Sequence, residues 1–348
     1  MYHAFHPGQL WLDTEGKPIQ AHGGSVMYLD GVYYWYGENK EKTDGKNSIW
    51  HWGVRCYSSA DLYNWQDLGL IIPPDTEDET SPLHPASMMD RPHILYNART
   101  KKFVCWLKIM ERNGAQTETI LTADSLTGPY TIVRKGLRPL GMSAGDFDLA
   151  AAQDGKGYYF FERVHSETIC ADLTDDYTDV TGYYSTHFPQ PGPPYVREAT
   201  AHFVRKGKHY LLTSGTTGYL PNPSQLAVAD AWHGPYRVLG NPHPDDPSMT
   251  SFHSQVSSVF QVQGKRDLYI AVADRWAPEW MDLEYDKYRR LFEKRFIPES
   301  SVELNFDPAE IPMDSGLATR DARYVWLPIH FDGEMGIINW YDEWRIED

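Results

Sequence analysis

The chain has few cysteines, and none of them is placed to bind zinc. Its 348 residues include only Cys56, Cys105 and Cys170, each inside an apolar, strand-like stretch. No Cys-x-x-Cys or Cys-x-x-His spacing occurs. An odd number of cysteines in such positions argues against a disulfide framework and favours buried thiols in a reducing compartment. We expect no catalytic metal and no cofactor.

Positive charge is also scarce. The 32 Lys and Arg residues face 48 Asp and Glu residues, so the formal net charge is −16. Nucleic acids and anionic membranes bind positive surfaces, so neither is an expected partner. The N-terminus has no basic patch followed by an apolar stretch, so we expect neither a signal peptide nor a membrane span. We expect a cytoplasmic protein, or a secreted one if a leader was removed, and the sequence leaves the oligomeric state open.

Aromatic residues are abundant. They make up 14% of the chain, with 12 Trp and 23 Tyr. Flat rings with a polar edge can stack on sugars and hydrogen-bond to them. The same residues are also common in β-strands, so composition alone allows both interpretations.

An internal repeat organises the chain. Each copy is an apolar strand, a turn with Gly or charge, and a second strand that opens with an aromatic residue. A third strand follows in most copies, so each unit has four strands, and units recur at roughly 50–60 residues. The paired strands lie at 24–38, 91–108, 147–163, 199–215 and 257–276, and third strands at 56–65, 121–130, 170–180 and 226–236.

The turns and the last unit complete the expected fold. Asp30-Gly31 and Asp154-Gly155 are favoured in type I′ hairpins. Within 279–296, four apolar residues fall at helical spacing, and strands resume at 323–331 and 336–344. The sequence thus predicts an all-β, five-bladed β-propeller of four-stranded blades, with a short helical insertion in the last blade. Residues 1–348 would form a single domain, with an exposed loop at 73–87. The four apolar residues of the insertion are Trp280, Leu283, Leu291 and Phe292.

Acidic residues precede several of the apolar strands. In a propeller the inner strands line one channel, so residues at their starts gather at one mouth. Glycoside hydrolysis needs a protonated acid and a group that activates water. The alternative is that these acids bind strand-edge amides or pair with Arg91 and Arg197. The candidates are His22, Asp90, Asp146, Asp148, Glu198, His253 and Gln255.

At these positions the sequence resembles glycoside hydrolase family 43, and within it the exo-β-1,3-galactanase branch, over essentially the full chain. The resemblance implies a five-bladed propeller and inversion at the anomeric carbon. The segments that carry it are 21–24, 34–40, 56–65, 91–97, 197–199, 213–223, 254–255, 274–276 and 323–328.

The resemblance also implies roles for individual acids. Glu198 lies in the family's Arg-Glu-Ala segment and corresponds to the general acid. Asp148 or Asp146 corresponds to the aspartate that orients this acid and tunes its pKa. Glu38 and Asp90 resemble acids that face the sugar in the terminal subsite, although the branch usually has Glu at the position of Asp90.

The family's usual catalytic base is missing. Most members have an aspartate where this chain reads Ala21-His22-Gly23. The galactanase branch shares this absence and is thought to use a glutamine, matched here by Gln255. An amide is a poor base unless it reacts as its imidic tautomer, so Gln255 either takes that form or positions the water while Glu38 or Asp90 accepts the proton.

The expected function is that of an inverting exo-acting hydrolase with an oligosaccharide as its partner. It would release terminal galactose from β-1,3-galactan or arabinogalactan-type oligosaccharides. One alternative is an α-L-arabinofuranosidase or β-D-galactofuranosidase on the same fold, and another is a non-catalytic glycan-binding propeller. Candidate substrate-binding residues are His22, Thr216, Thr217, His253, Trp276 and Trp326.

Overall fold

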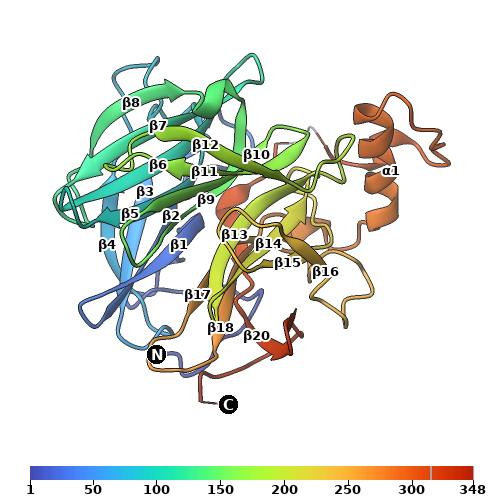
Figure 1. Ribbon diagram of the computed structural model, residues 1–348. Coiled ribbons are helices and arrows are strands. Elements are labelled where there is room, and N and C mark those ends of the chain that lie inside the picture. Colours follow the sequence, from blue (N-terminus) through green and yellow to red (C-terminus); the bar gives the residue numbers. More distant parts are fainter. Residues whose placement is uncertain (314–315, 348) are drawn as a thin grey trace.

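The structure, a computed structural model, describes residues 1–313 and 316–347. Its strands form five antiparallel sheets arranged as the blades of a propeller (Figure 1). The expected five-bladed all-β fold is therefore confirmed. Cys56, Cys105 and Cys170 are buried free thiols, as expected.

Within each blade the strands follow one another in chain order from the axis outwards. Blade one contains β1 (His22–Leu29), β2 (Val32–Glu38), β3 (Val54–Ser59) and β4 (Gln66–Ile72). Blade two contains β5 (Met88–Asn97), β6 (Lys102–Met110), β7 (Gln116–Ala123) and β8 (Thr131–Leu137). Blade three contains β9 (Ala144–Ala151), β10 (Gly157–Arg163), β11 (Glu167–Leu173) and β12 (Val180–His187).

The last two blades follow the same plan with one addition. Blade four contains β13 (Arg197–Arg205), β14 (Lys208–Gly215), β15 (Gln225–Ala229) and β16 (Arg237–Gly240). Blade five contains β17 (Gln255–Gln261), β18 (Tyr269–Arg275), β20 (Leu327–Asp332) and β21 (Met335–Ile337), and the two-residue β19 (Arg323–Tyr324) also pairs with β18.

The inner strands close the ring. Each of β1, β5, β9, β13 and β17 contacts the inner strands of both neighbouring blades, including β1 with β17. The chain termini reinforce this closure, because Phe5 forms a β-bridge with Trp344 and the Gly8 N–H donates to the Tyr324 carbonyl. Figure 1 shows both termini on the same side of the molecule.

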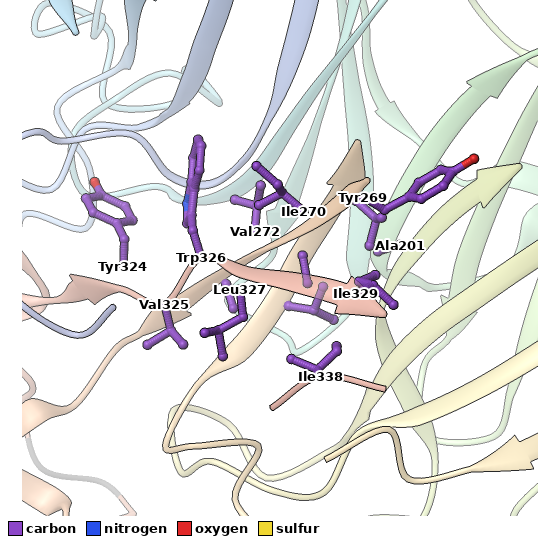
Figure 2. Close-up of a cluster of buried hydrophobic side chains, with 14 of the residues drawn as sticks. Ala201, Tyr269, Ile270, Val272, Tyr324, Val325, Trp326, Leu327, Ile329 and Ile338 are labelled. Atoms are coloured by element: carbon purple, nitrogen blue, oxygen red, sulfur yellow. The ribbon is translucent and has the colours of Figure 1, made fainter. Parts of the chain in front are cut away.

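The largest hydrophobic cluster lies between blades one, four and five. It includes Trp326, whose side chain is fully buried beside Tyr324 and Leu327 (Figure 2). The Trp326 ring centroid lies 4.6 Å from that of Trp35 and 6.0 Å from that of Trp65. Aromatic residues here fill the core, which is where many of the Trp residues noted in the composition lie.

The two expected hairpin turns differ. Asp30 and Gly31 have φ values of 50° and 89°, so both central residues adopt the positive φ that a type I′ turn needs. The second hairpin also forms, because β9 pairs with β10, but its turn is not of type I′. Asp154 lies in a longer turn in which the Ala152 N–H donates to the Lys156 carbonyl, and only Gly155 has positive φ.

The insertion in blade five forms a helix that starts later than expected. Residues Pro278–Trp280 form a 3-10 turn, and the α-helix α1 spans Tyr285–Phe296. Its buried Tyr288 hydroxyl donates to the Pro221 carbonyl, and Tyr195 donates to Glu293 at 2.6 Å. The helix is therefore fixed against the loops of blade four.

The C-terminal strands are shorter than expected. Residues 323–331 divide into β19 and β20, and 336–344 contribute only the end of β21. The chain leaves the sheet because the Ile338 N–H donates to the Pro242 carbonyl and the Trp340 N–H to Asp245. Residues 73–87 form a largely exposed loop, as expected. Among the described residues no helix is both long and apolar enough to cross a membrane.

Candidate active site

The inner strands carry β-bulges where they begin. Bulges reorient side chains and are common next to active sites. Gly23, Arg91 and Ala199 lie in such irregularities with φ values of 59°, 54° and 48°. The register shifts fall between His22 and Ser25, between Asp90 and His93, between Glu198 and Ala201, and between Val256 and Ser258.

Gly23 is required next to one of the candidate acids. A Cβ at this position would lie 2.4 Å from Oε1 of Glu38. Gly23 also has the positive φ that glycine adopts without cost. Glycine at this point of β1 therefore makes room for the Glu38 carboxylate.

These strand openings surround a pocket of about 170 Å³. A space of this size suits a small ligand. Four acids and two cations line it, together with an aromatic wall. The acids are Glu38, Asp90, Asp146 and Glu198; the cations are Arg91 and Lys108; the wall is Trp50, Tyr219 and Trp276; and Met110, Gly218 and Gln255 complete the lining.

The surroundings of Glu198 favour its protonated form, which is the form that a general acid needs. Burial raises its pKa well above the usual value, and the neighbouring acids Asp146 and Glu162 raise it further, against the opposing effect of Lys108 and Arg91. Burial and neighbouring negative charges both favour the protonated form of a carboxyl group. The wall of the pocket therefore holds a carboxylic acid that can donate a proton.

Asp146 stays ionised beside Glu198. Burial disfavours its charge, but the Arg91 guanidinium and the Lys108 ammonium outweigh burial and lower the pKa of Asp146 to about 2. The Arg91 Nη2 atom lies 2.8 Å from Oδ2, and Lys108 Nζ lies 2.6 Å from Oδ1. A fixed negative charge is thus held next to the acid.

Asp148 lies outside the pocket lining. Its carboxylate accepts hydrogen bonds from the backbone N–H groups of His202 at 2.7 Å and Leu149 at 2.8 Å. Burial raises the pKa of Asp148 to about 7. Of the two aspartates left open by the sequence, the structure brings Asp146 to Glu198 and places Asp148 between blades three and four.

Gln255 connects three strand openings. Its Nε2 atom donates to Oε1 of Glu198 at 3.1 Å and to Oγ of Ser214 at 3.0 Å. Its Oε1 atom accepts from Nη2 of Arg91 at 2.6 Å. The side-chain amide therefore has partners on both its nitrogen and its oxygen.

Glu38 and Asp90 lie beside a second buried cation, Lys40. The buried Lys40 ammonium is 2.7 Å from Oε2 of Glu38, an ion pair outside hydrogen-bond geometry, and 3.8 Å from Oδ1 of Asp90. Burial raises the pKa of Glu38 to about 7, despite Lys40. For Asp90, burial is outweighed by Lys108 and Lys40, and its pKa is lowered. Trp50 Nε1 also donates to Oδ1 of Asp90 at 2.7 Å.

Two of the expected substrate-binding residues lie at or beside the pocket. Trp276 lines it, and His253 borders a small adjoining space with Tyr219 and Trp276. His22 is fully buried behind Trp276, with Nδ1 2.9 Å from Asp274.

Three other expected substrate-binding residues lie away from the pocket lining. The Thr216 hydroxyl donates to the Val196 carbonyl at 3.0 Å, and that of Thr217 donates to the Leu220 carbonyl at 2.5 Å. The hydroxyls of these threonines thus stabilise the backbone of their loop. Gly218 and Tyr219 are the residues of that loop that line the pocket. Trp326 belongs to the hydrophobic core, so stacking on a sugar is incompatible with its position.

Several residues of the site were not predicted from the sequence. Lys108 interrupts an apolar run in β6, and a charged residue in such a run was a usable indication, because a buried ammonium needs carboxylate partners. Lys40, Trp50 and Tyr219 lie on loops, where strand periodicity gives no indication. Within residues 1–313 and 316–347, no group of three or more His, Cys, Asp or Glu side chains is arranged to hold a metal ion.

Solved structures of known proteins share the fold over almost the whole chain. A β-1,3-galactosidase of family 43 is 30% identical with a TM-score of 0.79, and the match covers 99% of this chain and 63% of that one. A second β-1,3-galactosidase of the family, solved with galactodeoxynojirimycin, is 27% identical with a TM-score of 0.77. The match covers 98% of this chain and 100% of that one. An exo-β-1,3-galactanase from Clostridium thermocellum is 25% identical with a TM-score of 0.73 and coverage of 98% and 66%.

Sequence comparison gives a concordant result. An Escherichia coli (strain K12) protein named "Putative beta-xylosidase" is 29% identical over 230 residues, which cover 59% of this chain and 38% of that protein. This chain therefore spans well under two thirds of that relative. The model of glycosyl hydrolases family 43 matches residues 17–276, which include every acid of the pocket. The chain belongs to glycosyl hydrolases family 43.

Proposed function

We propose that the chain is an inverting, exo-acting β-galactosidase that releases terminal galactose from β-1,3-galactan or arabinogalactan-type oligosaccharides. The observation that carries the proposal is the placement of Glu198, an acid of raised pKa, beside ionised Asp146 in a pocket for one sugar. The protein solved with galactodeoxynojirimycin, matched over its full length, supports galactose as the sugar.

Glu198 would protonate the oxygen of the leaving group. Gln255 donates to Oε1 of Glu198, which leaves Oε2 to carry the proton. Asp146 keeps that proton in place, because a neighbouring negative charge disfavours ionisation of Glu198. As the glycosidic bond breaks, the proton passes to the departing oxygen and Glu198 becomes ionised.

A carboxylate, rather than the amide of Gln255, would accept the proton of the attacking water. Arg91 donates to Oε1 of Gln255, so this oxygen serves as an acceptor, as in the ordinary amide. Both N–H groups of that amide are also engaged. We assign the acceptor role to Asp90, because its pKa is lowered and its Oδ2 atom lies 3.4 Å from Lys108, while Oδ1 already accepts from Trp50.

The aromatic wall would bind the faces of the sugar. The ring centroids of Trp50 and Tyr219 are 6.1 Å apart, and those of Tyr219 and Trp276 are 5.5 Å apart. Such a continuous surface of rings suits the apolar faces of a pyranose, while the charged groups of the lining bind its hydroxyls. A one-sugar pocket also favours release of single terminal residues.

A panel of substrates tests this function. The purified protein would be incubated with β-1,3-galactotriose and with nitrophenyl β-galactopyranoside, β-galactofuranoside, α-L-arabinofuranoside and β-xyloside. We expect stepwise release of galactose from the trisaccharide, with α-galactose as the first anomer seen by NMR. Hydrolysis of the arabinofuranoside alone, or β-galactose as the first product, would refute the proposal. Binding without turnover would identify a glycan-binding protein instead.

A further inference from the structure

Three consecutive residues ahead of β17 have a left-handed backbone. Ser251, Phe252 and His253 have φ values of 54°, 57° and 55°. Elsewhere in the described chain, positive φ occurs at non-glycine residues only singly. The left-handed conformation costs free energy at every residue with a Cβ, so a run of three persists only where the surroundings enforce it.

The buried carboxylate of Asp246 enforces this turn. Its Oδ2 atom accepts from the N–H groups of Thr250 at 2.8 Å and Phe252 at 3.1 Å. Its Oδ1 atom accepts from the N–H of Ser248 at 3.2 Å and from the Ser248 hydroxyl. Burial opposes the charge, but these hydrogen bonds outweigh it and lower the pKa of Asp246. One ionised side chain thus gathers the donors of the turn.

The opposite side of the turn is tied to blades four and five. The Ser251 hydroxyl donates to the Asn222 carbonyl at 2.8 Å, in the loop that follows β14. Nη2 of Arg275, at the end of β18, donates to the Phe252 carbonyl at 2.9 Å. The turn is therefore a rigid connection between the two blades.

Gln255 follows the turn after a single residue. That residue, Ser254, donates its hydroxyl to the Ser251 carbonyl at 2.6 Å and its N–H to the Thr250 carbonyl at 3.2 Å. β17 then begins with Gln255, whose amide reaches Glu198 at 3.1 Å. The path of the backbone into β17, and with it the position of the amide, is set by the turn.

We propose that Asp246 is a positioning residue for Gln255, and through it for the acid Glu198. Without the carboxylate, the N–H groups of Thr250 and Phe252 lose their acceptor, and the backbone through the left-handed residues 251–253 relaxes. Gln255 then moves away from Glu198. The proposal rests on the proposed function only in its kinetic consequence, because the position of Gln255 is a structural property of the chain.

Asp246→Ala tests the proposal by kinetics, with the glycoside that the unaltered protein hydrolyses best. We expect kcat to fall about 10- to 100-fold, the effect of a displacement of the order of 1 Å. KM should stay within about threefold of its value in the unaltered protein, because Gln255 contacts the acid and not the aromatic wall. Asp246→Asn should lose less activity, since it keeps one of the two acceptor oxygens.

Asp61→Ala is the matched control. The Asp61 carboxylate plays the same local part in blade one, where Oδ1 accepts from the N–H groups of Tyr63 at 2.9 Å and Asn64 at 2.8 Å beside the left-handed Leu62. It lies outside the pocket lining. We expect Asp61→Ala to lower the melting temperature by a similar amount while kcat remains unchanged. Equal losses of kcat in the two alanine variants would overturn the proposal.

A crystal structure of Asp246→Ala separates this inference from the proposed function. We expect the contact between Gln255 Nε2 and Glu198 Oε1 to be broken whether or not any galactoside is hydrolysed. An unchanged contact would refute the positioning role. If the alanine variant does not fold, Asp246→Asn provides the test. Its amide nitrogen would face backbone N–H donors, which it cannot accept from. A kcat equal to that of the unaltered protein would then overturn the proposal.

Discussion

The guanidinium of Arg91 donates a hydrogen bond of 2.6 Å to the side-chain oxygen of Gln255. An arginine has donors only, so the oxygen it contacts is an acceptor. The imidic form of a glutamine would carry a proton on that oxygen, and Arg91 disfavours it. Gln255 is therefore better placed to orient Glu198 than to act as a base.

Azide rescue identifies the residue that activates water. Asp90→Ala should lower kcat by about 10²- to 10⁴-fold, the usual range for loss of a general base. Azide needs no deprotonation, so it should restore turnover and yield the α-galactosyl azide. Rescue of Glu38→Ala or Gln255→Ala, with none for Asp90→Ala, would assign the base elsewhere.

The pKa of Glu198 depends on Asp146. Replacing Asp146 by Asn removes a negative charge and leaves Arg91 and Lys108 near the acid, so the pKa of Glu198 should fall. In the proposed function Glu198 reacts as the protonated acid, so the alkaline limb of kcat/KM should move to lower pH by about one unit, equivalent to about 1.4 kcal/mol. Asp148→Asn, two residues along β9 and outside the pocket lining, is the control and should leave this limb in place.

Ionisation of Glu162 should lower the free energy of unfolding as pH rises. Burial raises the pKa of this side chain to about 7 from 4.5, so the folded state holds a proton that the unfolded state has lost. Its contribution is fully present below pH 4.5 and is lost as pH rises through 7. Glu162→Gln mimics the neutral form and keeps an acceptor for the His165 N–H.

Chemical denaturation from pH 4 to 9 checks this prediction. The free energy of unfolding of Glu162→Gln should decline less above pH 5 than that of the unaltered protein, with a difference on the order of 2 kcal/mol at pH 8. Parallel curves for the two proteins would show that Glu162 does not carry the shifted proton.

Two tryptophans should separate core packing from sugar binding. Trp326→Phe should lower the free energy of unfolding by about 1–3 kcal/mol, because Trp326 fills the core, and should leave KM unchanged. Trp50→Phe removes the donor to Asp90 at the pocket wall, so KM should rise with little change in stability. Thermal melts and Michaelis curves for both variants check the pair, and a raised KM in Trp326→Phe would contradict its place in the core.

The repeat in the sequence was sufficient to predict the fold, because each unit shows the same strand, turn and strand order. Local turn geometry was harder, since Asp154-Gly155 has the same dipeptide signature as Asp30-Gly31 but lies in a longer connection. The predicted C-terminal strand was too long, because Trp340 leaves the sheet for a tertiary contact with Asp245. Periodicity does not report such contacts.

The sequence predicted those site residues that are acids at the starts of inner strands. Glu198, Asp146 and Asp90 reach the same pocket because the ring brings strand openings together. The choice between Asp146 and Asp148 required coordinates, because strand periodicity alone places both on one face and does not reveal the register shift beside Asp146. Arg91 was recognised only as a partner for acids, and its contact with Gln255 depends on a bulge that the sequence does not reveal.

The most direct measurement compares Glu198→Gln with the unaltered protein on two β-galactosides that differ in their leaving groups. On β-1,3-galactobiose, whose leaving oxygen needs a proton, we expect kcat to fall by at least about 10²-fold. On dinitrophenyl β-galactoside, whose phenolate leaves without protonation, the fall should be much smaller. Equal turnover by the two proteins on the disaccharide would contradict the assignment of Glu198 as the acid.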